Sequence, residues 1–240
     1  MLQTTRAIVL RTIRYGDKSV VLRAYTERSG LRSFMVRTGG KGPSRTAALQ
    51  PLSRVELVVP EAGEGELRTV RELRIERPYS RLQLEPVRGV LLLFAQEVFD
   101  RTLREESADT RLYAFVQEVL ETADTGAELP YQPLLLLVGL SRHLGFFPEV
   151  PEEGEQGFDL REGRFFHGPA PHEFCMAAEQ VRLFVELIGR VERPEERRPL
   201  QASGMTRRQL LEDLLMYFRL HVEGFGELRS LEVLRAVLEQ

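Results

Sequence analysis

The sequence predicts an α+β protein in which a small β-barrel precedes an all-α bundle. Two observations carry this prediction. The period of the apolar residues changes from two to that of a helix near residue 80, and the charge changes sign along the chain. Residues 1 to 54 carry eleven lysines and arginines against two acidic residues, a net charge of +9, whereas the whole 240-residue chain carries −3. A basic module joined to an acidic module is therefore expected.

Five segments of the first part alternate apolar residues with arginine or polar residues, and turn signals separate them. Their ranges are 5–15, 19–26, 31–38, 53–60 and 66–77. Five short strands with one longer interruption before the fourth predict a five-stranded OB-fold barrel over residues 1–80, although an SH3-like barrel or a two-layer sandwich gives a similar pattern. Arginines recur along the first three strands, so guanidinium groups are expected on the outer face of the sheet; these are Arg11, Arg23, Arg32 and Arg37.

Helical periodicity begins after residue 80 and predicts an α-helical domain over residues 81–240 of about six helices. Pro86 suits a first helical turn, Asp109 suits an N-cap, and Gly145 with Pro148 ends a third helix over 129–148. Three later helices are expected at about 173–191, at 206–221 and after Ser230. An acidic, Gly- and Pro-rich insertion at about 149–172 separates the third helix from the first of these later helices, with a possible hairpin in 158–166.

The composition also restricts the compartment. No apolar run reaches the roughly 18 residues that span a bilayer, and the first residues contain arginines and no small-residue cleavage site, unlike a signal peptide. Cys175 is the only cysteine, which excludes an internal disulfide and fits a reducing compartment. We therefore expect a cytoplasmic protein.

An enzyme is not expected, because no nucleophile with a base, no carboxylate pair and no metal set can be recognised in the sequence. The glycine-rich run VRTGGKGPSRTAAL (36–49) lacks the GxxxxGK[ST] spacing of a P-loop. Pro43 also removes an N–H group that a phosphate nest would use. This run is better interpreted as a flexible basic hairpin loop, part of a track for a polynucleotide.

The run HGPAPHEFC places His167, His172 and Cys175 within nine residues. Zinc normally takes four such ligands, and no second cysteine is nearby. The alternative is two loop histidines beside a buried thiol. No metal is predicted here, and whether the three residues bind one stays open at this stage.

The basic part of the chain predicts a surface for phosphate groups. Arginine supplies nearly all of its positive charge, and the planar guanidinium group binds phosphate in a bidentate manner. Tyr15, Tyr25 and Phe34 could stack on bases, although a small barrel also needs large residues in its core. A basic solvated face, or an adaptor that binds an acidic protein tail, would show the same charge pattern. The candidate DNA-binding residues are Arg11, Arg14, Lys18, Arg23, Arg37, Lys41 and Arg45.

The order of residues adds a resemblance. The run AIVLRTIRYGDKSVVLRAYTERSGLRSFMVRTGGKGPSRTAALQPLSRVEL (7–57) resembles the N-terminal domain of the bacterial RecO family of recombination mediators, with its VLR strand, YG(D/E) turn and glycine-containing basic loop. ELPYQPLLLLVGLSRHLGFFPEV and LRSLEVLRAVL resemble the central and last helices of that family. The insertion departs from it, because many members carry a four-cysteine zinc ribbon there and this chain has only Cys175.

The resemblance implies a protein without enzymatic activity or cofactor. Such a protein binds single- and double-stranded DNA, anneals complementary strands, engages the single-stranded-DNA-binding protein SSB and, with RecR, helps to load RecA. The acidic, apolar tail of SSB would bind to the helical domain, where Arg101, Arg104, Arg111 and Arg142 are candidates. Packing of the hairpin and its phenylalanines would replace zinc in the insertion; these are Phe158, Phe165, Phe166 and Phe174.

Overall fold

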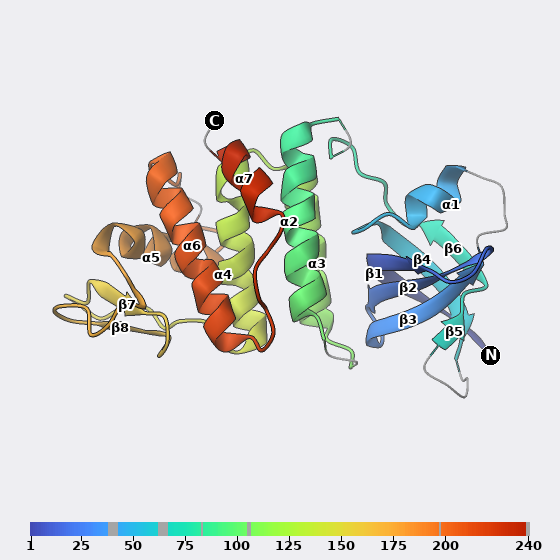
Figure 1. Ribbon diagram of the computed structural model, residues 1–240, viewed down its shortest axis with the longest axis horizontal. Coiled ribbons are helices and arrows are strands. Elements are labelled where there is room, and N and C mark those ends of the chain that lie inside the picture. The colour runs from blue at the N-terminus through green and yellow to red at the C-terminus, as the bar shows by residue number, and fades with distance from the viewer. Residues whose placement is uncertain (38–42, 62–66, 83, 105–106, 197, 239–240) are drawn as a thin grey trace. The chain divides into compact units, whose positions relative to one another are not determined.

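The computed structural model describes residues 1–240 except 38–42, 62–66, 83, 105–106, 197 and 239–240. For 43–45 and 236–238 it describes the backbone alone. The chain divides into two compact units, Met1–Thr125 and Gly126–Gln240. The first unit contains the larger sheet, one short helix and two long helices, and the second contains the remaining helices and a small sheet (Figure 1).

The first unit is built on one six-stranded sheet of order β5-β3-β2-β1-β4-β6. Neighbouring strands pair antiparallel, except for β3 and β5, which are parallel. The strands are β1 (Leu2–Arg14), β2 (Ser19–Thr26), β3 (Gly30–Arg37), β4 (Arg54–Pro60), β5 (Leu67–Thr69) and β6 (Glu72–Ile75).

The expected single fifth strand at 66–77 is wrong in detail, because the structure divides it between β5 and β6. The division falls at Val70 and Arg71. The N–H of Val70 donates to the carbonyl of Met35 in β3 at 2.9 Å, and the N–H of Arg71 donates to Val58 in β4 at 2.8 Å. One short segment therefore supplies both ends of the strand order and curls the sheet into an OB-fold-like half-barrel.

The barrel core consists of alternate residues from β1 to β4, such as Leu22, Phe34, Val36 and Leu57, each at most 3% exposed. Helix α1 (Pro43–Ala48) lies between β3 and β4, and Ala48 joins the core. The expected hairpin loop is thus a helix in its second half, because a buried alanine can pack there. Residues 38–42, the glycine-rich half, lie outside the described residues.

Two long helices complete the first unit, α2 (Pro86–Thr102) and α3 (Thr110–Thr125). Pro86 occupies the first turn of α2 as expected. Asp109 caps α3, since its Oδ1 accepts the N–H groups of Arg111 at 3.0 Å and Leu112 at 2.9 Å. The sequence predictions for both helix starts are confirmed.

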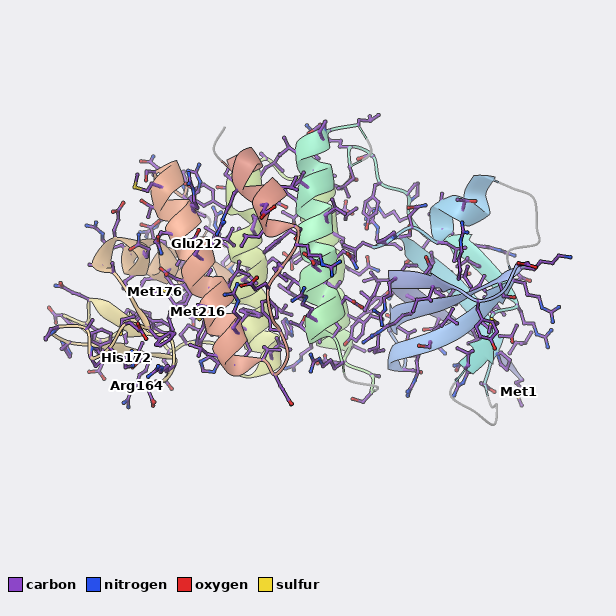
Figure 2. All side chains as sticks on the ribbon, viewed as in Figure 1. Met1, Arg164, His172, Met176, Glu212 and Met216 are labelled. Carbon is purple, nitrogen blue, oxygen red and sulfur yellow. The ribbon has the colours of Figure 1, made fainter. Side chains whose placement is uncertain are left out.

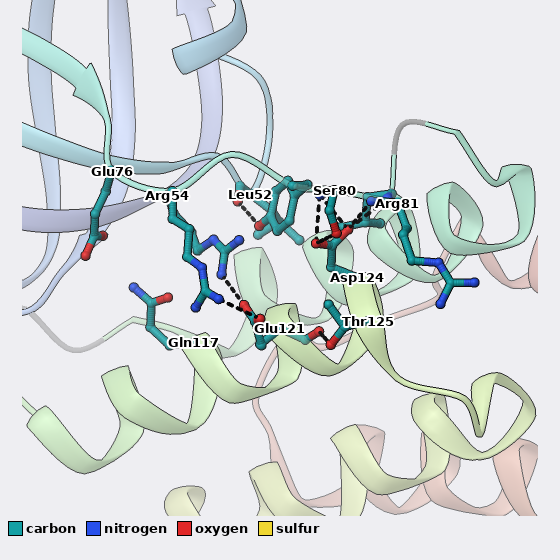
Figure 3. A network of polar contacts seen from close by, with 12 residues as sticks. Leu52, Arg54, Glu76, Ser80, Arg81, Gln117, Glu121, Asp124 and Thr125 are labelled. Atoms are coloured by element: carbon teal, nitrogen blue, oxygen red, sulfur yellow. Dashed lines mark hydrogen bonds and ion pairs between the residues drawn. The ribbon is translucent and has the colours of Figure 1, made fainter.

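A buried arginine joins the barrel to α3 (Figure 3). The Arg54 side chain is 2% exposed, and its Nη1 binds Oε2 of Glu121 at 2.7 Å. The other carboxylate oxygen of Glu121 binds Arg77 at 3.1 Å. The Arg54 guanidinium also lies 4.5 Å from the ring centre of Tyr79, whose hydroxyl donates to the Leu52 carbonyl at 2.6 Å. A buried charge needs such a partner set, because an unpaired one is costly.

Asp124 fixes the chain where the barrel ends (Figure 3). Its carboxylate is buried and accepts the backbone N–H groups of Ser80 at 2.8 Å, Arg81 at 2.8 Å and Leu82 at 2.9 Å, with the Ser80 hydroxyl at 2.9 Å. Burial alone would raise the pKa of Asp124, but these donors prevail and lower it to about 2. The connection between barrel and helices is therefore fixed by one carboxylate.

The second unit packs α4, α5 and α6 against one another. Gly145 ends α4 in the left-handed conformation, with φ of +85°, as its sequence position predicted. The expected hairpin in 158–166 is confirmed, and a third strand, β9, joins it. The elements of the second unit are η1 (Leu129–Tyr131), α4 (Gln132–Leu144), β7 (Gly157–Asp159), β8 (Arg164–Phe166), β9 (Cys175–Met176), α5 (Ala178–Glu192), α6 (Gly204–His221) and α7 (Leu231–Leu238).

The start of α5 was expected near residue 173 but lies at Ala178, because residues 175–176 pair with β7 instead. Aromatic rings fix this small sheet to the helices. Phe158 is fully buried, and its ring centre lies 4.8 Å from Phe165, 5.0 Å from Phe184 and 5.5 Å from Tyr217. The expected packing of the hairpin phenylalanines is confirmed for Phe158 and Phe165.

Replacing Asp124 by asparagine tests the connection. Because the folded pKa is depressed, its stabilisation is complete above about pH 4 and is lost as the pH falls toward 2. Asp124→Asn should lower the free energy of unfolding by about 2 kcal/mol at pH 7. The difference from wild type should shrink below pH 4 in denaturant titrations, while Asp17→Asn, on an exposed turn, should change little. A pH-independent difference would contradict this assignment.

Candidate nucleic-acid interface

Strand pairing places three of the predicted arginines on one side of the sheet. Arg11 pairs with Arg23, which pairs with Ser33, and directly paired residues point to the same face. Further along, Arg37 pairs with Ser19 on the same side, because side chains alternate along a strand. The residues between them, Leu22 and Phe34 among these, point into the core.

We name this side the β1–β3 outer face and define it by Arg11, Ile13, Tyr15, Arg23 and Arg37. Ile13 and Tyr15 are 50% and 62% exposed. Tyr15 follows the end of β1 and continues its pairing, since its N–H donates to the Ser19 carbonyl at 2.9 Å. Exposed apolar and aromatic groups between arginines suit a nucleic-acid strand, whose bases stack while its phosphates pair.

Positive charge gathers where β1 ends and β2 begins. Arg14 is the last residue of β1, Lys18 lies in the following turn, and Arg37 ends the neighbouring β3. All three side chains are exposed. Among the residues that the structure describes, none of the three has a carboxylate partner. Lys41 lies outside the described residues, as does the side chain of Arg45, so their predicted role stays a prediction.

Arg11 and Arg23 differ from these three because an acidic residue of α2 faces them. Asp100 Oδ2 lies 3.8 Å from Nη1 of Arg11, and Oδ1 lies 4.0 Å from Nε of Arg23. These separations fit ion pairs but are too long for hydrogen bonds. The role of both arginines in phosphate binding stays a prediction, and a carboxylate beside them neutralises part of their charge.

Other arginines of the basic segment serve the fold. Arg6 binds Glu27 through two nitrogens and lies 3.6 Å from Glu76. Arg54 is buried against Glu121. The net charge of +9 in residues 1 to 54 therefore overstates the charge available to a ligand, because part of it is neutralised by carboxylates that the fold brings close.

Only one of the three candidate stacking residues is available on the surface. Tyr25 is fully buried, and its ring stacks on Tyr113 of α3 at 6.2 Å between centres. Phe34 is 3% exposed in the barrel core. Tyr15 is exposed beside Arg14, so it alone of the three can meet a base.

The four arginines predicted to bind the SSB tail belong to different parts of the structure. Arg101 pairs with Glu97 at 3.4 Å, and Arg104 Nε donates to the carbonyl of Arg101 at 3.1 Å. Arg111 is in the first turn of α3, so these three lie near the α2–α3 connection. Arg142 belongs to the second unit, where it contacts the carbonyl of Val191 at 3.5 Å. A common site for all four remains a prediction.

The residues considered above as metal ligands lie at the small sheet of the second unit, where Figure 2 labels His172. His172 Nε2 lies 3.1 Å from Oδ2 of Asp159, and its Nδ1 lies 3.7 Å from Sγ of Cys175. Nδ1 also accepts the N–H of Phe174 at 3.2 Å. The three side chains that lie together are thus Asp159, His172 and Cys175, and His167 is not among them.

These residues do not fit a four-cysteine zinc ribbon, since the chain has one cysteine. Both ring nitrogens of His172 instead have protein partners, which join the segment around Cys175 to β7. Burial raises the pKa of Asp159, but the N–H groups of Glu162 and Arg161 and the nearby His172 outweigh it and lower that pKa. A charged, hydrogen-bonded carboxylate is thus part of this contact.

The fold and this surface define a class of protein in which an OB-fold-like barrel with a basic outer face precedes a helical region. The family models agree: Recombination protein O N terminal matches residues 1–79, and Recombination protein O C terminal matches residues 84–232. The chain belongs to the RecO family. Among the described residues, no helix is both long and apolar enough to cross a membrane.

Relatives named DNA repair protein RecO align over nearly the whole chain. The protein of Christiangramia forsetii is 27% identical over 240 residues, covering 99% of each chain. That of Phocaeicola vulgatus is 29% identical with 98% of each chain covered, and that of Bacteroides fragilis is 27% identical over the full length of both. The sequence resemblance to this family is therefore confirmed.

Neutralising Arg14, Lys18 and Arg37 together should weaken binding to single-stranded DNA. If the protein neutralises four to six phosphates, log affinity falls with log salt at a slope of about −3 to −4. The triple glutamine variant should make this slope shallower by about 2, since each phosphate neutralised on a single strand accounts for about 0.7 of it. Fluorescence anisotropy at several salt concentrations measures both slopes.

Arg28→Gln is the matched control. Arg28 is exposed in the turn between β2 and β3, at the opposite end of β2 and roughly 25 Å away at strand rise. It should leave the slope unchanged. Equal effects of Arg28→Gln and the single Arg14, Lys18 or Arg37 variants would mean that general charge, rather than this end of the sheet, binds DNA.

Replacing Tyr15 by alanine separates stacking from charge. Base stacking on an aromatic side chain contributes about 1–3 kcal/mol per base, so Tyr15→Ala should reduce affinity about five- to a hundredfold with an unchanged salt slope. Tyr15→Phe should retain binding because the ring remains. Wild-type affinity of the alanine variant would exclude Tyr15 as a stacking platform.

Proposed function

We propose that this protein is a recombination mediator that binds single- and double-stranded DNA and anneals complementary strands. The observation that carries the proposal is the exposed group of Arg14, Lys18 and Arg37 beside Tyr15, at one end of a curled sheet in a RecO-family chain. A polynucleotide matches this group because it offers repeated phosphates beside exposed bases.

The physical role in annealing is electrostatic. Two DNA strands repel each other through their phosphates, and a surface that neutralises both brings their bases close enough to pair. Contacts to phosphate carry no sequence information. Annealing by this surface should therefore act on any complementary pair, as repair requires.

We further propose that the protein acts by binding and not by turnover, in the cytoplasm, and that with RecR it helps to load RecA onto SSB-coated DNA. Membership of the RecO family supports these partners. The acidic tail of SSB would meet arginines of the helical part, for which Arg101, Arg104 and Arg111 near the α2–α3 connection form one candidate group. Arg142 is a separate candidate.

The alternative is an adaptor whose basic barrel binds an acidic protein tail and no DNA. Charge alone does not separate an acidic peptide from a polynucleotide. The exposed Tyr15 favours a ligand with bases to stack. A mobility-shift experiment at about 0.1 M salt, with an acidic peptide as competitor, decides between the two, because the adaptor would show no shifted DNA.

Annealing of labelled complementary strands tests the proposal directly. The wild-type protein should accelerate pairing well above the spontaneous rate, with and without SSB on the strands, and higher salt should suppress the acceleration. The triple variant at Arg14, Lys18 and Arg37 should lose most of the acceleration, whereas Arg28→Gln should keep it. A wild-type protein that binds DNA but never accelerates pairing would refute the annealing role.

A further inference from the structure

The Arg11–Arg23 pair with Asp100 does not resemble a contact made for stability. Two arginines face each other on neighbouring strands, an arrangement that like-charge repulsion disfavours. An anion beside them relieves this repulsion. Asp100 of α2 supplies the anion, at 3.8 and 4.0 Å from the two guanidinium groups.

The carboxylate is poorly satisfied in this position. Its Oδ1 is buried and accepts no hydrogen bond from any residue that the structure describes. A buried acceptor without a hydrogen bond is unfavourable, and most buried polar atoms of native structures have a partner. Glu121 and Asp124 in Figure 3, by contrast, accept close hydrogen bonds from their partners.

A phosphodiester group would fit between these arginines better than Asp100 does. It carries one negative charge over two terminal oxygens, as a carboxylate does, and guanidinium groups bind it through direct hydrogen bonds. The pair lies on the β1–β3 outer face, in the same face as Tyr15 and Arg37. Arg11 is 47% exposed and Arg23 26% exposed, so an incoming strand can reach them.

We infer that Arg11 and Arg23 form a phosphate subsite for the DNA backbone and that Asp100 occupies it as an internal competitor. In the absence of DNA, the carboxylate neutralises the two arginines. When a strand binds, its phosphate displaces the carboxylate and takes over the ion pairs. This inference rests on the proposed DNA binding and adds to it a residue that weakens that binding.

Asp100→Asn tests the inference with a labelled oligothymidylate as the probe. The variant should bind about three- to tenfold more tightly at about 0.1 M salt, since the phosphate no longer has to displace a carboxylate from the two arginines. Its salt slope should stay within about 0.7 of the wild-type slope, because the same phosphate occupies the subsite in both complexes. Equal or weaker binding than wild type would overturn the inference.

Glu97→Gln is the matched control, because Glu97 lies one turn earlier on α2 and pairs with Arg101 at 3.4 Å. It removes the same charge from the same helix. If Asp100 competes at the subsite, this variant should gain much less affinity than Asp100→Asn. Equal gains would show a general charge effect and would overturn the role of Asp100 as a competitor.

A double-mutant cycle provides the decisive measurement. In a background of Arg11→Gln and Arg23→Gln, Asp100→Asn should no longer increase affinity, because the side chains that it releases are absent. A gain that persists in this background overturns the inference. Thermal unfolding without DNA shows that each variant is folded, and addition of DNA should stabilise Asp100→Asn more than wild type.

These outcomes separate the inference from the proposed function. If the wild-type protein binds no DNA, the function and the subsite both fail. If it binds DNA through Arg14, Lys18 and Arg37 while Asp100→Asn behaves as Glu97→Gln, only the role of Asp100 fails.

Discussion

The contact between Arg54 and Glu121 is the constraint on which the first unit depends. It joins a strand to a helix that lies 67 positions later in the chain, through a guanidinium group that is almost fully buried. Removal of Glu121 would leave the Arg54 charge without compensation in the interior, which is strongly destabilising. Asp124, one turn further along α3, holds the connecting chain in the same region. Together they keep α2 and α3 against the barrel, and α2 carries Asp100.

This arrangement explains why the basic segment is only partly a ligand surface. Arginine residues at both ends of the segment, Arg6 and Arg54, bind carboxylates that the fold requires. The arginines in the middle divide into a pair next to α2 and a group at the sheet end beyond it. The helices thus determine which charges remain available, so that a solvated cluster develops where no acidic element covers the described strands.

Much of the fold could be predicted from the sequence, because local signals coincide with real boundaries. Asp109 and Gly145 mark helix ends through backbone needs that any chain would have. The break at Val70 and Arg71 could not be found, since a run of alternating residues looks the same whether it pairs with one strand or with two. The exchange of His167 for Asp159 beside His172 was also hidden, because the partner lies 13 positions away and reaches the histidine only after β7 and β9 pair.

The surface was predicted less completely than the fold. The period of two placed Arg11, Arg23 and Arg37 on one face as expected, but the same expectation for Arg32 was wrong, because Arg32 pairs with Ala24 and points to the opposite side of the sheet. Sequence periodicity carries no information about a carboxylate from a distant helix, so Asp100 was missed. The burial of Tyr25 depends in the same way on Tyr113 of α3, which no pattern within β2 reveals.

The segment that contacts β3 through Val70 and β4 through Arg71 has an implication for how the chain tolerates change. An inserted or deleted residue between these two would displace the pairing on both sides at once, because the two donors are adjacent. Insertions and deletions should therefore be tolerated in surface turns, where one pairing at most is affected. They should be destabilising between Val70 and Arg71. The peptide unit that joins Val70 to Arg71 therefore sets the register of both pairings, and with it the circumference of the curled sheet.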